Sequence, residues 1–330
     1  MKREGYLMEK IADPDNLRWA FWKAQRGKSA KAEVRNYQKG LDKNLMRLRE
    51  ELLAGAVSVG NYHYFKVYDP KERQICAAAF SERVLHHALM NVCHANFEKY
   101  QIHDSYASRL GKGTFAALKR AHSFQRKYRW FLKLDVRKFF DSIDHEVLKA
   151  LLLKRFKEAG LLAVFAAIID SYHTQSAKGV PIGNLTSQYF ANHYLAVGDH
   201  FIKETLGIEG YVRYMDDMVL WSNDKTKLHQ KGRQLSTFLG ADLKLELKPF
   251  CLNKVSAGLP FLGYLVYPFT VRLNRNSRDR FVKKLNLYER NITNAVWNQG
   301  DYQRHVLPLL SFVKHAESAG FRRKWLQSHS

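Results

Sequence analysis

The adjacent residues Asp216 and Asp217 are the first candidates for chemistry in this chain. They interrupt the apolar run of residues 211–221. Neighbouring aspartates destabilise the interior of a strand because both carboxylates resist burial and repel each other, so a β-hairpin with the pair at its turn is predicted. Such a turn can bind a metal ion, although an Asp-Asp turn is also common at solvated hairpin tips. The assignment therefore depends on other residues.

A third carboxylate, Asp135, lies on the polar face of a predicted strand over residues 131–136, where alternate residues are apolar. Taken alone, Asp135 could be a surface group paired with Lys133 or Arg137. If this strand lies beside the hairpin, three carboxylates meet at one edge of a sheet and need cations to offset their repulsion. Two Mg²⁺ ions, with Mn²⁺ as a substitute, could bind there, activate a 3′-hydroxyl and stabilise a leaving pyrophosphate. The predicted chemistry is phosphoryl transfer onto a growing strand.

The elements that must position these residues alternate between helices and strands. A basic region over residues 15–55 has apolar residues at helical spacing. The other expected elements are a strand at 62–68, a helix at 81–100, the strand at 131–136, a helix capped by Asp144, a loop at 179–183, a helix at 186–206 and the hairpin. This order favours an α+β fold in which two separate strands can lie side by side.

The composition favours a globular protein that binds a polyanion. Of 330 residues, 46% are hydrophobic, which is enough for a large core. The chain contains 54 Lys and Arg against 31 Asp and Glu, a net charge of +23, and the basic residues occur in nearly every segment with aromatic residues between them. This pattern is unusual for a cytosolic metabolic enzyme and is typical of a long nucleic-acid groove with stacking contacts.

The three cysteines, Cys76, Cys93 and Cys251, have neither paired nor zinc-like spacing, so we expect a reducing compartment and small core residues. Residues 1–9 contain no apolar signal segment, and the longest apolar run, at 161–170, is too short to cross a membrane. These features predict a cytoplasmic protein without membrane contact.

Six blocks in order along the chain resemble the motifs of reverse transcriptases. They comprise residues 71–89, 104–113, 135–144, 179–188, 214–217, and Lys248 with residues 261–264. The resemblance covers most of the chain and implies an RNA-directed DNA polymerase with a right-hand fold. The implied parts are an N-terminal basic helical extension (1–60), fingers (61–130), an antiparallel-sheet palm (131–268) and a helical thumb (269–330).

The resemblance also implies a role for each motif. Asp135, Asp216 and Asp217 would be catalytic and hold the metal ions, with the Val136 carbonyl as an added ligand. Residues implied to bind the nucleotide or template are Lys71, Arg73, Phe140, Ile182, Gly183, Gln188, Tyr214, Met215 and Lys248. The primer grip would consist of Phe261, Leu262, Gly263 and Tyr264.

Two of these residues have specific expected functions. Phe140, five residues after Asp135, could form the base of the pocket that holds the sugar of the nucleotide. Its ring would clash with a 2′-hydroxyl, which would select deoxynucleotides. Lys248 could donate a proton to pyrophosphate or contact a phosphate. Its alternative is a place on the polar face of a strand, because it follows alternating leucines at 243, 245 and 247.

The nucleotide-pocket motif narrows the family. Group II intron and retroviral relatives usually have Gln-Gly followed by Ser-Pro, whereas this chain has Ile182-Gly183 and Ser187-Gln188. This form is similar to the reverse transcriptases of diversity-generating retroelements, encoded by bacteria, archaea or phages. Those enzymes copy a template RNA with errors at adenines and work with a small, basic, oligomeric accessory variability protein. The implied partners are template RNA, the cDNA/RNA hybrid, dNTPs and this accessory protein.

Two alternatives to this function stay open. The chain could be a group II-like, retron-like or phage-defence reverse transcriptase, which would have a different genetic neighbourhood. It could also be a catalytically silent RNA-binding scaffold, which would bind RNA without extending a primer.

Overall fold

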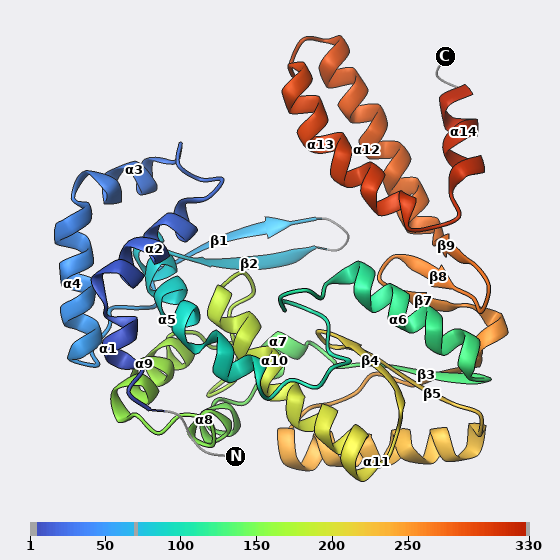
Figure 1. The fold of residues 1–330 in the computed structure, drawn as a ribbon, viewed down its shortest axis with the longest axis horizontal. Helices are drawn as coiled ribbons and strands as arrows, with labels where there is room; N and C mark the ends of the chain where they lie inside the picture. Colours follow the sequence, from blue (N-terminus) through green and yellow to red (C-terminus); the bar gives the residue numbers. More distant parts are fainter. Residues whose placement is uncertain (1–4, 69–71, 328–330) are drawn as a thin grey trace. The chain divides into compact units, whose positions relative to one another are not determined.

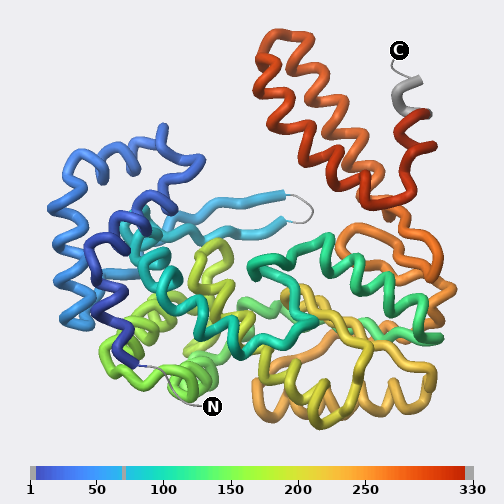
Figure 2. Tube along the Cα trace, in the orientation of Figure 1, coloured from blue at the N-terminus to red at the C-terminus, as the bar shows by residue number. Residues whose placement is uncertain are grey.

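The computed structural model describes residues 5–68 and 72–327 and divides the chain into two compact units (Figure 1). Unit 1 combines Met1–His103, Asp135–Leu206 and Gln234–Lys248. Unit 2 combines Asp104–Leu134, Gly207–Arg233 and Pro249–Ser330. Figure 2 traces the chain through these interleaved segments. The contiguous division into extension, fingers, palm and thumb stays a prediction.

Unit 1 begins with the expected basic helices. They are α1 (Met8–Ile11), α2 (Pro14–Gln25), α3 (Ala32–Lys39) and α4 (Leu41–Leu53). The side chain of Asp13 caps α2 by accepting hydrogen bonds from the backbone N–H groups of Asp15 and Asn16. Leu45, Leu48 and Leu52 form the buried face of α4. The apolar spacing of the sequence therefore predicted the helix and these three inward-facing leucines, whereas Leu53, which has the same apolar character, is exposed.

A two-stranded antiparallel ribbon follows, formed by β1 (Tyr62–Val67) and β2 (Arg73–Ala78). The chain then enters α5 (Phe80–Glu98). After Tyr62, which is half-buried, every residue of β1 is exposed, whereas Cys76 and Ala78 of β2 are buried. The ribbon is thus anchored through β2.

The remaining helices of unit 1 are α7 (Phe139–Ser142), α8 (His145–Leu153), α9 (Ala159–Asp170) and α10 (Leu185–His200). As expected, Asp144 caps α8, and its carboxylate accepts a hydrogen bond from the Val147 N–H. Lys244, 2.8 Å from this carboxylate, and the Val147 N–H hold the pKa of Asp144 below its ordinary value, although burial by itself would raise it. The helix expected to reach residue 206 ends in a π-helical turn over Phe201–Thr205.

Unit 2 contains the sheet that carries the Asp-Asp hairpin. Its strands are β4 (Gly210–Tyr214), β5 (Asp217–Ser222), β3 (Trp130–Asp135) and β6 (Cys251–Lys254), hydrogen-bonded in the order β4-β5-β3-β6. The pairs β4–β5 and β3–β6 are antiparallel. Helix α6 (Thr114–Lys127) packs on β4, and its Phe124 joins the core with Phe131 and Trp221. Asp135, the last residue of β3, belongs to unit 1.

A second sheet of unit 2 consists of the short antiparallel strands β7 (Leu259–Phe261), β8 (Tyr264–Val266) and β9 (Val271–Leu273). Three helices follow, α12 (Arg275–Thr293), α13 (Gln299–Lys314) and α14 (Ala319–Gln327). Asn274 caps α12, and Asn298 with Asp301 forms a capping box at α13. The segment expected to be thumb-like is therefore helical.

Two expectations require correction. The leucines at 243, 245 and 247 do not lie on one strand, because α11 (Lys225–Leu243) continues to Leu243 and residues 244–248 pair only through a bridge between Leu247 and Val136. Cys76 and Cys93 are buried, but Cys251 is only partly buried, because it lies on the edge strand β6. No helix within the described residues is long and apolar enough to span a bilayer.

Candidate active site

The Asp-Asp hairpin of unit 2 has a two-residue turn. Tyr214 pairs with Asp217 across the turn, which consists of Met215 and Asp216. Asp216 therefore lies in the turn as expected, and Asp217 is the first residue of β5. Met215 has a left-handed backbone with φ +53°, a conformation that costs a non-glycine residue roughly 1–2 kcal/mol. Both aspartates are partly exposed.

Lys133 supports the Asp217 carboxylate from the neighbouring strand β3. Its ammonium lies 3.0 Å from Asp217 Oδ2 and also donates to the Pro260 carbonyl at 2.8 Å. Both side chains of the ion pair are 22% exposed, so water screens the pair only in part. Lys133 was one of the two partners considered for Asp135 in the alternative interpretation, but it connects the hairpin to β7 instead.

Arg213, which was not predicted from the sequence, supports the turn by a hydrogen bond from its buried side chain. Its side chain is completely buried, and Nη1 donates to the Met215 carbonyl at 3.3 Å. The backbone of Arg213 is held on both sides, since its N–H donates to the Asp104 carbonyl and its carbonyl accepts from Tyr106. The signal was present in the sequence, where a single basic residue interrupts the apolar strand before the hairpin.

Asp135 ends β3 and belongs to unit 1, where Lys248 is its partner. The Lys248 ammonium lies 2.7 Å from Asp135 Oδ1, and the Lys248 N–H donates to the Asp135 carbonyl at 2.9 Å. Arg137, the other partner considered for Asp135, pairs with Glu246. The structure thus brings together two of the implied site residues, Asp135 and Lys248. The meeting of Asp135 with Asp216 and Asp217 stays a prediction.

The segment after Asp135 contacts the loop expected to form the nucleotide pocket. Val136 is buried, Phe140 is half-buried, and the Phe140 carbonyl accepts a hydrogen bond from the Val180 N–H at 2.9 Å. On the other side of the loop, the Ile182 carbonyl accepts a hydrogen bond from the Cys76 N–H at 3.0 Å. The loop is therefore held between the end of the Asp135 motif and strand β2.

Gly183 is required by this close approach to β2. Its φ is +120°, and a Cβ atom would lie 2.9 Å from Ile75 Cγ2 and 3.2 Å from the Cys76 carbonyl oxygen. The next residue, Asn184, accepts a hydrogen bond from the Ala78 N–H and immediately precedes α10. The loop consequently crosses β2 at a distance that only glycine permits.

Other expected nucleotide or template contacts are also in unit 1. Arg73 is exposed at the start of β2, and Gln188 is half-buried in the first turn of α10. Lys71 lies outside the described residues. In unit 2, the Tyr214 hydroxyl accepts a hydrogen bond from Thr114 Oγ1 at 3.2 Å.

The expected primer-grip residues form the turn between β7 and β8. Phe261 and Tyr264 are buried, and the Tyr264 hydroxyl donates to the Phe312 carbonyl at 2.7 Å. Leu262 and Gly263 both have positive φ. A Cβ atom at Gly263 would lie 2.9 Å from the Phe312 ring and from Ser277 Oγ, so this turn packs tightly on α12 and α13.

The candidate side-chain ligands are all carboxylates, which Mg²⁺ prefers, and the added candidate, the Val136 carbonyl, is also an oxygen donor. Within residues 5–68 and 72–327, no three His, Cys, Asp or Glu side chains gather as a ready metal-binding group. Asp135 and Asp217 each face a lysine ammonium, so both positions already accommodate positive charge. The donor set therefore fits a hard divalent cation.

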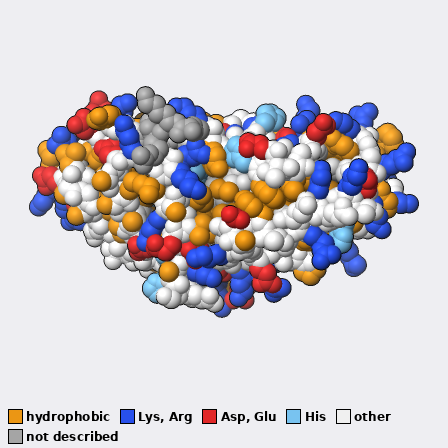
Figure 3. All heavy atoms as spheres, turned by 90° about the horizontal axis from the view of Figure 1, so that it is seen from below, with side chains coloured by type: hydrophobic (Ala, Val, Ile, Leu, Met, Phe, Trp, Pro, Cys, Tyr) orange, Lys and Arg blue, Asp and Glu red, His pale blue; other side chains and the backbone are white. Residues whose placement is uncertain are grey.

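Basic side chains are distributed rather than concentrated. Figure 3 shows Lys and Arg side chains at several separate places on the displayed face, with apolar side chains between them. This distribution agrees with the net charge of +23 and with contacts to a long polyanion.

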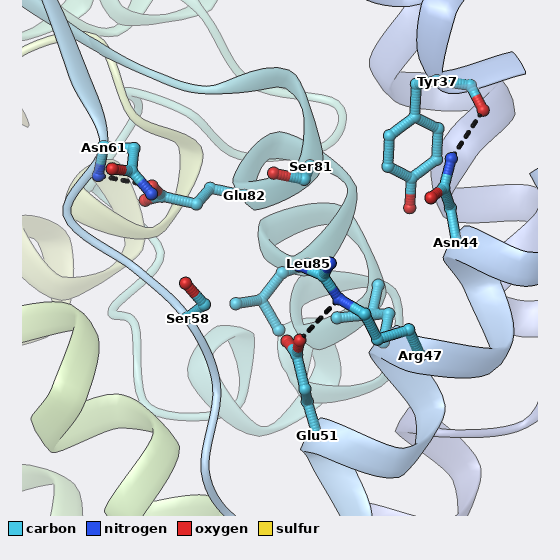
Figure 4. Close-up of a pocket in the computed structure, with 10 residues that line it drawn as sticks. Tyr37, Asn44, Arg47, Glu51, Ser58, Asn61, Ser81, Glu82 and Leu85 are labelled. Carbon is cyan, nitrogen blue, oxygen red and sulfur yellow. Dashed lines mark hydrogen bonds and ion pairs between the residues drawn. The ribbon is translucent and has the colours of Figure 1, made fainter. Parts of the chain in front are cut away.

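Unit 1 also contains a polar pocket of about 170 Å³ between α4, α5 and the segment that precedes β1 (Figure 4). The Glu82 carboxylate, which is buried, accepts a hydrogen bond from the Asn61 N–H at 2.7 Å. Burial raises the pKa of Glu82. Arg47 pairs with Glu51 at 2.9 Å on the α4 side. None of the implied site residues lines this pocket. Its hydrogen bond between Glu82 and Asn61 holds the segment that leads into β1.

Comparison with known proteins identifies the family. Residues 69–266, more than half of the chain, match the family model described as reverse transcriptase (RNA-dependent DNA polymerase). An uncharacterised 91 kDa protein in the cob intron of Schizosaccharomyces pombe is 25% identical over 138 residues, which are 40% of this chain and 17% of that protein. The COX1/OXI3 intron 2 protein of Saccharomyces cerevisiae is 24% identical over 107 residues, or 30% and 12% of the two chains. This chain thus spans less than a fifth of either relative.

A solved structure agrees with the family in fold. Apo telomerase from Candida tropicalis, truncated from its C-terminal domain, has a TM-score of 0.50 and 14% identity, and the match covers 65% of this chain and 55% of that one. This similarity supports the polymerase fold alone. The extent of the family match, together with an Asp-Asp hairpin inside the matched residues, shows that the chain belongs to the reverse transcriptase (RNA-dependent DNA polymerase) family.

Proposed function

We propose that the chain is an RNA-directed DNA polymerase that extends a primer 3′-hydroxyl on an RNA template with dNTPs. The observation that carries the proposal is the hairpin within the family match, with Asp216 in its turn and Asp217 at the start of β5. Strand β5 is the sheet neighbour of β3, the strand that ends at Asp135. That Asp135, Asp216 and Asp217 form a single carboxylate site is implied by the family resemblance and is part of this proposal.

Asp135, Asp216 and Asp217 would hold two Mg²⁺ ions, with the Val136 carbonyl as an added ligand. When bound, such ions lower the cost of deprotonating a hydroxyl and of developing charge on a leaving pyrophosphate. Lys133 and Lys248 lie 3.0 Å and 2.7 Å from the Asp217 and Asp135 carboxylates and orient them. Lys248 is also placed beside Asp135 to contact a phosphate or to donate a proton.

The other pocket residues select the nucleotide. The half-buried Phe140 ring would oppose a 2′-hydroxyl, and the Ile182-Gly183 segment, which is hydrogen-bonded to β2, would contact the base pair. Arg73 on β2 would contact the triphosphate, because a guanidinium can donate two parallel hydrogen bonds to phosphate oxygens.

Primer extension on RNA tests the polymerase assignment. Asp216→Asn preserves size and removes one carboxylate charge, so we expect at least about a hundredfold less DNA synthesis with RNA binding unchanged. Asp224→Asn is the matched control, since Asp224 is an exposed residue that accepts a hydrogen bond from Lys227 N–H at the start of α11, a role that asparagine also performs. Normal extension by Asp216→Asn would contradict the site. Absence of extension by the unmodified chain, with intact RNA binding, would favour the scaffold alternative.

We further propose that this polymerase serves a diversity-generating retroelement and copies its template RNA with errors at adenines, together with an accessory variability protein. Support comes from Ile182, where relatives of ordinary fidelity usually have Gln. A Gln amide there could hydrogen-bond beside the sugar of the incoming nucleotide, whereas the apolar Ile side chain gives no directional contact. With Ile, the difference in binding free energy between a correct and a mispaired nucleotide would therefore be smaller.

Ile182→Gln tests the retroelement assignment. The hydrogen bond between Ile182 and Cys76 involves only backbone atoms, so the substitution changes the side chain without removing this anchor. We expect fewer misincorporations opposite template adenine, and a smaller change opposite the other three bases, in sequenced cDNA. An unchanged adenine error rate would remove Ile182 from the explanation and leave a group II-like, retron-like or phage-defence enzyme as the alternative.

A further inference from the structure

Residues 177–179, which lead into the nucleotide-pocket loop, are hydrogen-bonded to residues 143–145, which follow Phe140. The Gly179 N–H donates to the Ile143 carbonyl at 2.8 Å, and the His145 N–H donates to the Ala177 carbonyl at 3.0 Å. These two backbone bonds join the start of α8 to residues 177–179. These two hydrogen bonds therefore hold residues 177–179 in a fixed position relative to the start of α8.

One side chain of α8 adds a contact to the same place. His145, the first residue of α8, is only 3% exposed, and its Nε2 lies 2.7 Å from the Gly179 carbonyl oxygen. A carbonyl oxygen can only accept a hydrogen bond, so Nε2 is the donor. Gly179 has φ +102°, and its Cβ would lie 2.8 Å from Thr174 Oγ1. The imidazole therefore holds a carbonyl in a backbone conformation that only glycine adopts readily.

An acidic residue orients the imidazole from its other side. Asp170, the last residue of α9, has Oδ1 at 3.3 Å from His145 Nδ1. The other oxygen of Asp170 lies 2.9 Å from the Lys149 ammonium, which also contacts Glu146 at 3.1 Å. When the ring is protonated, both nitrogens donate, Nε2 to the Gly179 carbonyl and Nδ1 to the Asp170 carboxylate, and the ring then has one preferred orientation.

We propose that His145 is a positioning residue for the nucleotide pocket. It fixes the Gly179 carbonyl and so determines where Ile182 and Gly183 lie, three and four residues further along the chain. The far end of the same loop is fixed by the bond from Cys76 N–H to Ile182. A loop held at both ends presents its pocket residues without the entropy cost of ordering them when a nucleotide binds. This inference rests on the proposed polymerase function.

Two near-isosteric substitutions separate the role of each ring nitrogen. His145→Gln can place an amide N–H near the position of Nε2 and so keep the bond to Gly179. His145→Asn can place its amide N–H near the position of Nδ1 and keep the contact with Asp170, but it does not reach Gly179. Both variants lose the buried imidazole and gain an equally polar amide. A difference between the two variants therefore reports the position of the amide.

Steady-state primer extension on RNA gives the first readout. We expect His145→Asn to raise the KM for dNTPs about fivefold to tenfold, as for the loss of one hydrogen bond, with kcat changed less than twofold and RNA affinity unchanged. His145→Gln should stay within about twofold of the unmodified chain. Asp170→Asn, at a residue that is half exposed, should give a smaller rise than His145→Asn and serves if the histidine variants are poorly folded.

Amide hydrogen exchange over residues 177–184 gives a second readout that needs no activity. We expect faster exchange there in His145→Asn than in His145→Gln, with equal exchange in β3 and β6. Equal KM values and equal exchange in the two variants would overturn the positioning role. If the unmodified chain extends no primer while the exchange difference is present, the proposed function fails and His145 still fixes the loop.

Discussion

Gly183→Ala should cost more stability than a glycine substitution that only strains the backbone. At φ +120°, a non-glycine residue carries a strain of roughly 1–3 kcal/mol. The new methyl group would also lie 2.9 Å from Ile75 Cγ2 and 3.2 Å from the Cys76 carbonyl oxygen. Overpacking of this kind typically costs about 1–3 kcal/mol. We therefore expect the free energy of unfolding of the variant to fall by about 2–6 kcal/mol, or the loop to move away from β2.

Gly27→Ala is the matched control for this measurement. Gly27 also has a positive φ, +69°, but no atom lies within 4 Å of its added Cβ. It should lose only the backbone contribution of about 1–2 kcal/mol. Urea unfolding of both variants gives the difference, and dNTP titration of primer extension shows whether a displaced loop raises the KM. A loss for Gly183→Ala no larger than that for Gly27→Ala, with an unchanged KM, would refute the close packing of the loop on β2.

Three further expectations follow from the site, the charge and the buried histidines. Phe140→Ala should admit ribonucleotides by opening space for the 2′-hydroxyl, and unchanged discrimination between dATP and ATP would assign the ring to packing alone. RNA affinity should fall steeply with salt, because a chain of net charge +23 that neutralises several phosphates releases as many counterions; a flat salt titration would contradict a long basic groove. Burial lowers the pKa of His86 to about 3 and of His193 to about 4. Since both histidines stay neutral when folded but take up protons when unfolded, the stability that they contribute together should be fully present well above pH 6.5 and fall by about 2–3 kcal/mol per pH unit near pH 5. His193→Gln removes one of the two contributions, so the slope of stability against pH, measured by urea unfolding, should become shallower.

Local patterns predicted much of the fold. The leucine spacing of α4, the Asp144 cap and the alternation in β3 each depend on residues within a few positions, and all three are present in the structure. The three-residue strands β7, β8 and β9 were not predicted, because a strand of that length is too short to show a periodic pattern.

The partners of the carboxylates could not be predicted in the same way. Lys133 and Asp135 are two residues apart and therefore on one face of β3, so Lys133, like Arg137, was a possible partner of Asp135. The sheet instead places β5 beside β3, so Lys133 contacts Asp217, while Asp135 receives Lys248 from the end of a distant segment. Pairing between strands is a non-local property, and charge alone does not determine which of several lysines will be nearest.

The Arg213 and His145 contacts illustrate a different difficulty. Both residues are buried and act on backbone carbonyls, of Met215 and Gly179. A sequence shows that such a side chain interrupts an apolar environment, but it does not show which carbonyl lacks a donor. These contacts became visible only when the loops had been placed.

The alternation of chain segments between the two units has a consequence for synthesis and for dissection of the protein. Unit 1 requires residues as late as Lys248, and unit 2 requires residues as early as Asp104. During translation, neither unit can complete its native contacts until most of the chain has left the ribosome, so partly made chains expose unpaired apolar surface to chaperones. No single cut yields an intact unit, and fragments chosen by motif boundaries will lack part of a core. A split version of the protein must therefore be assembled from complementary pieces that fold together.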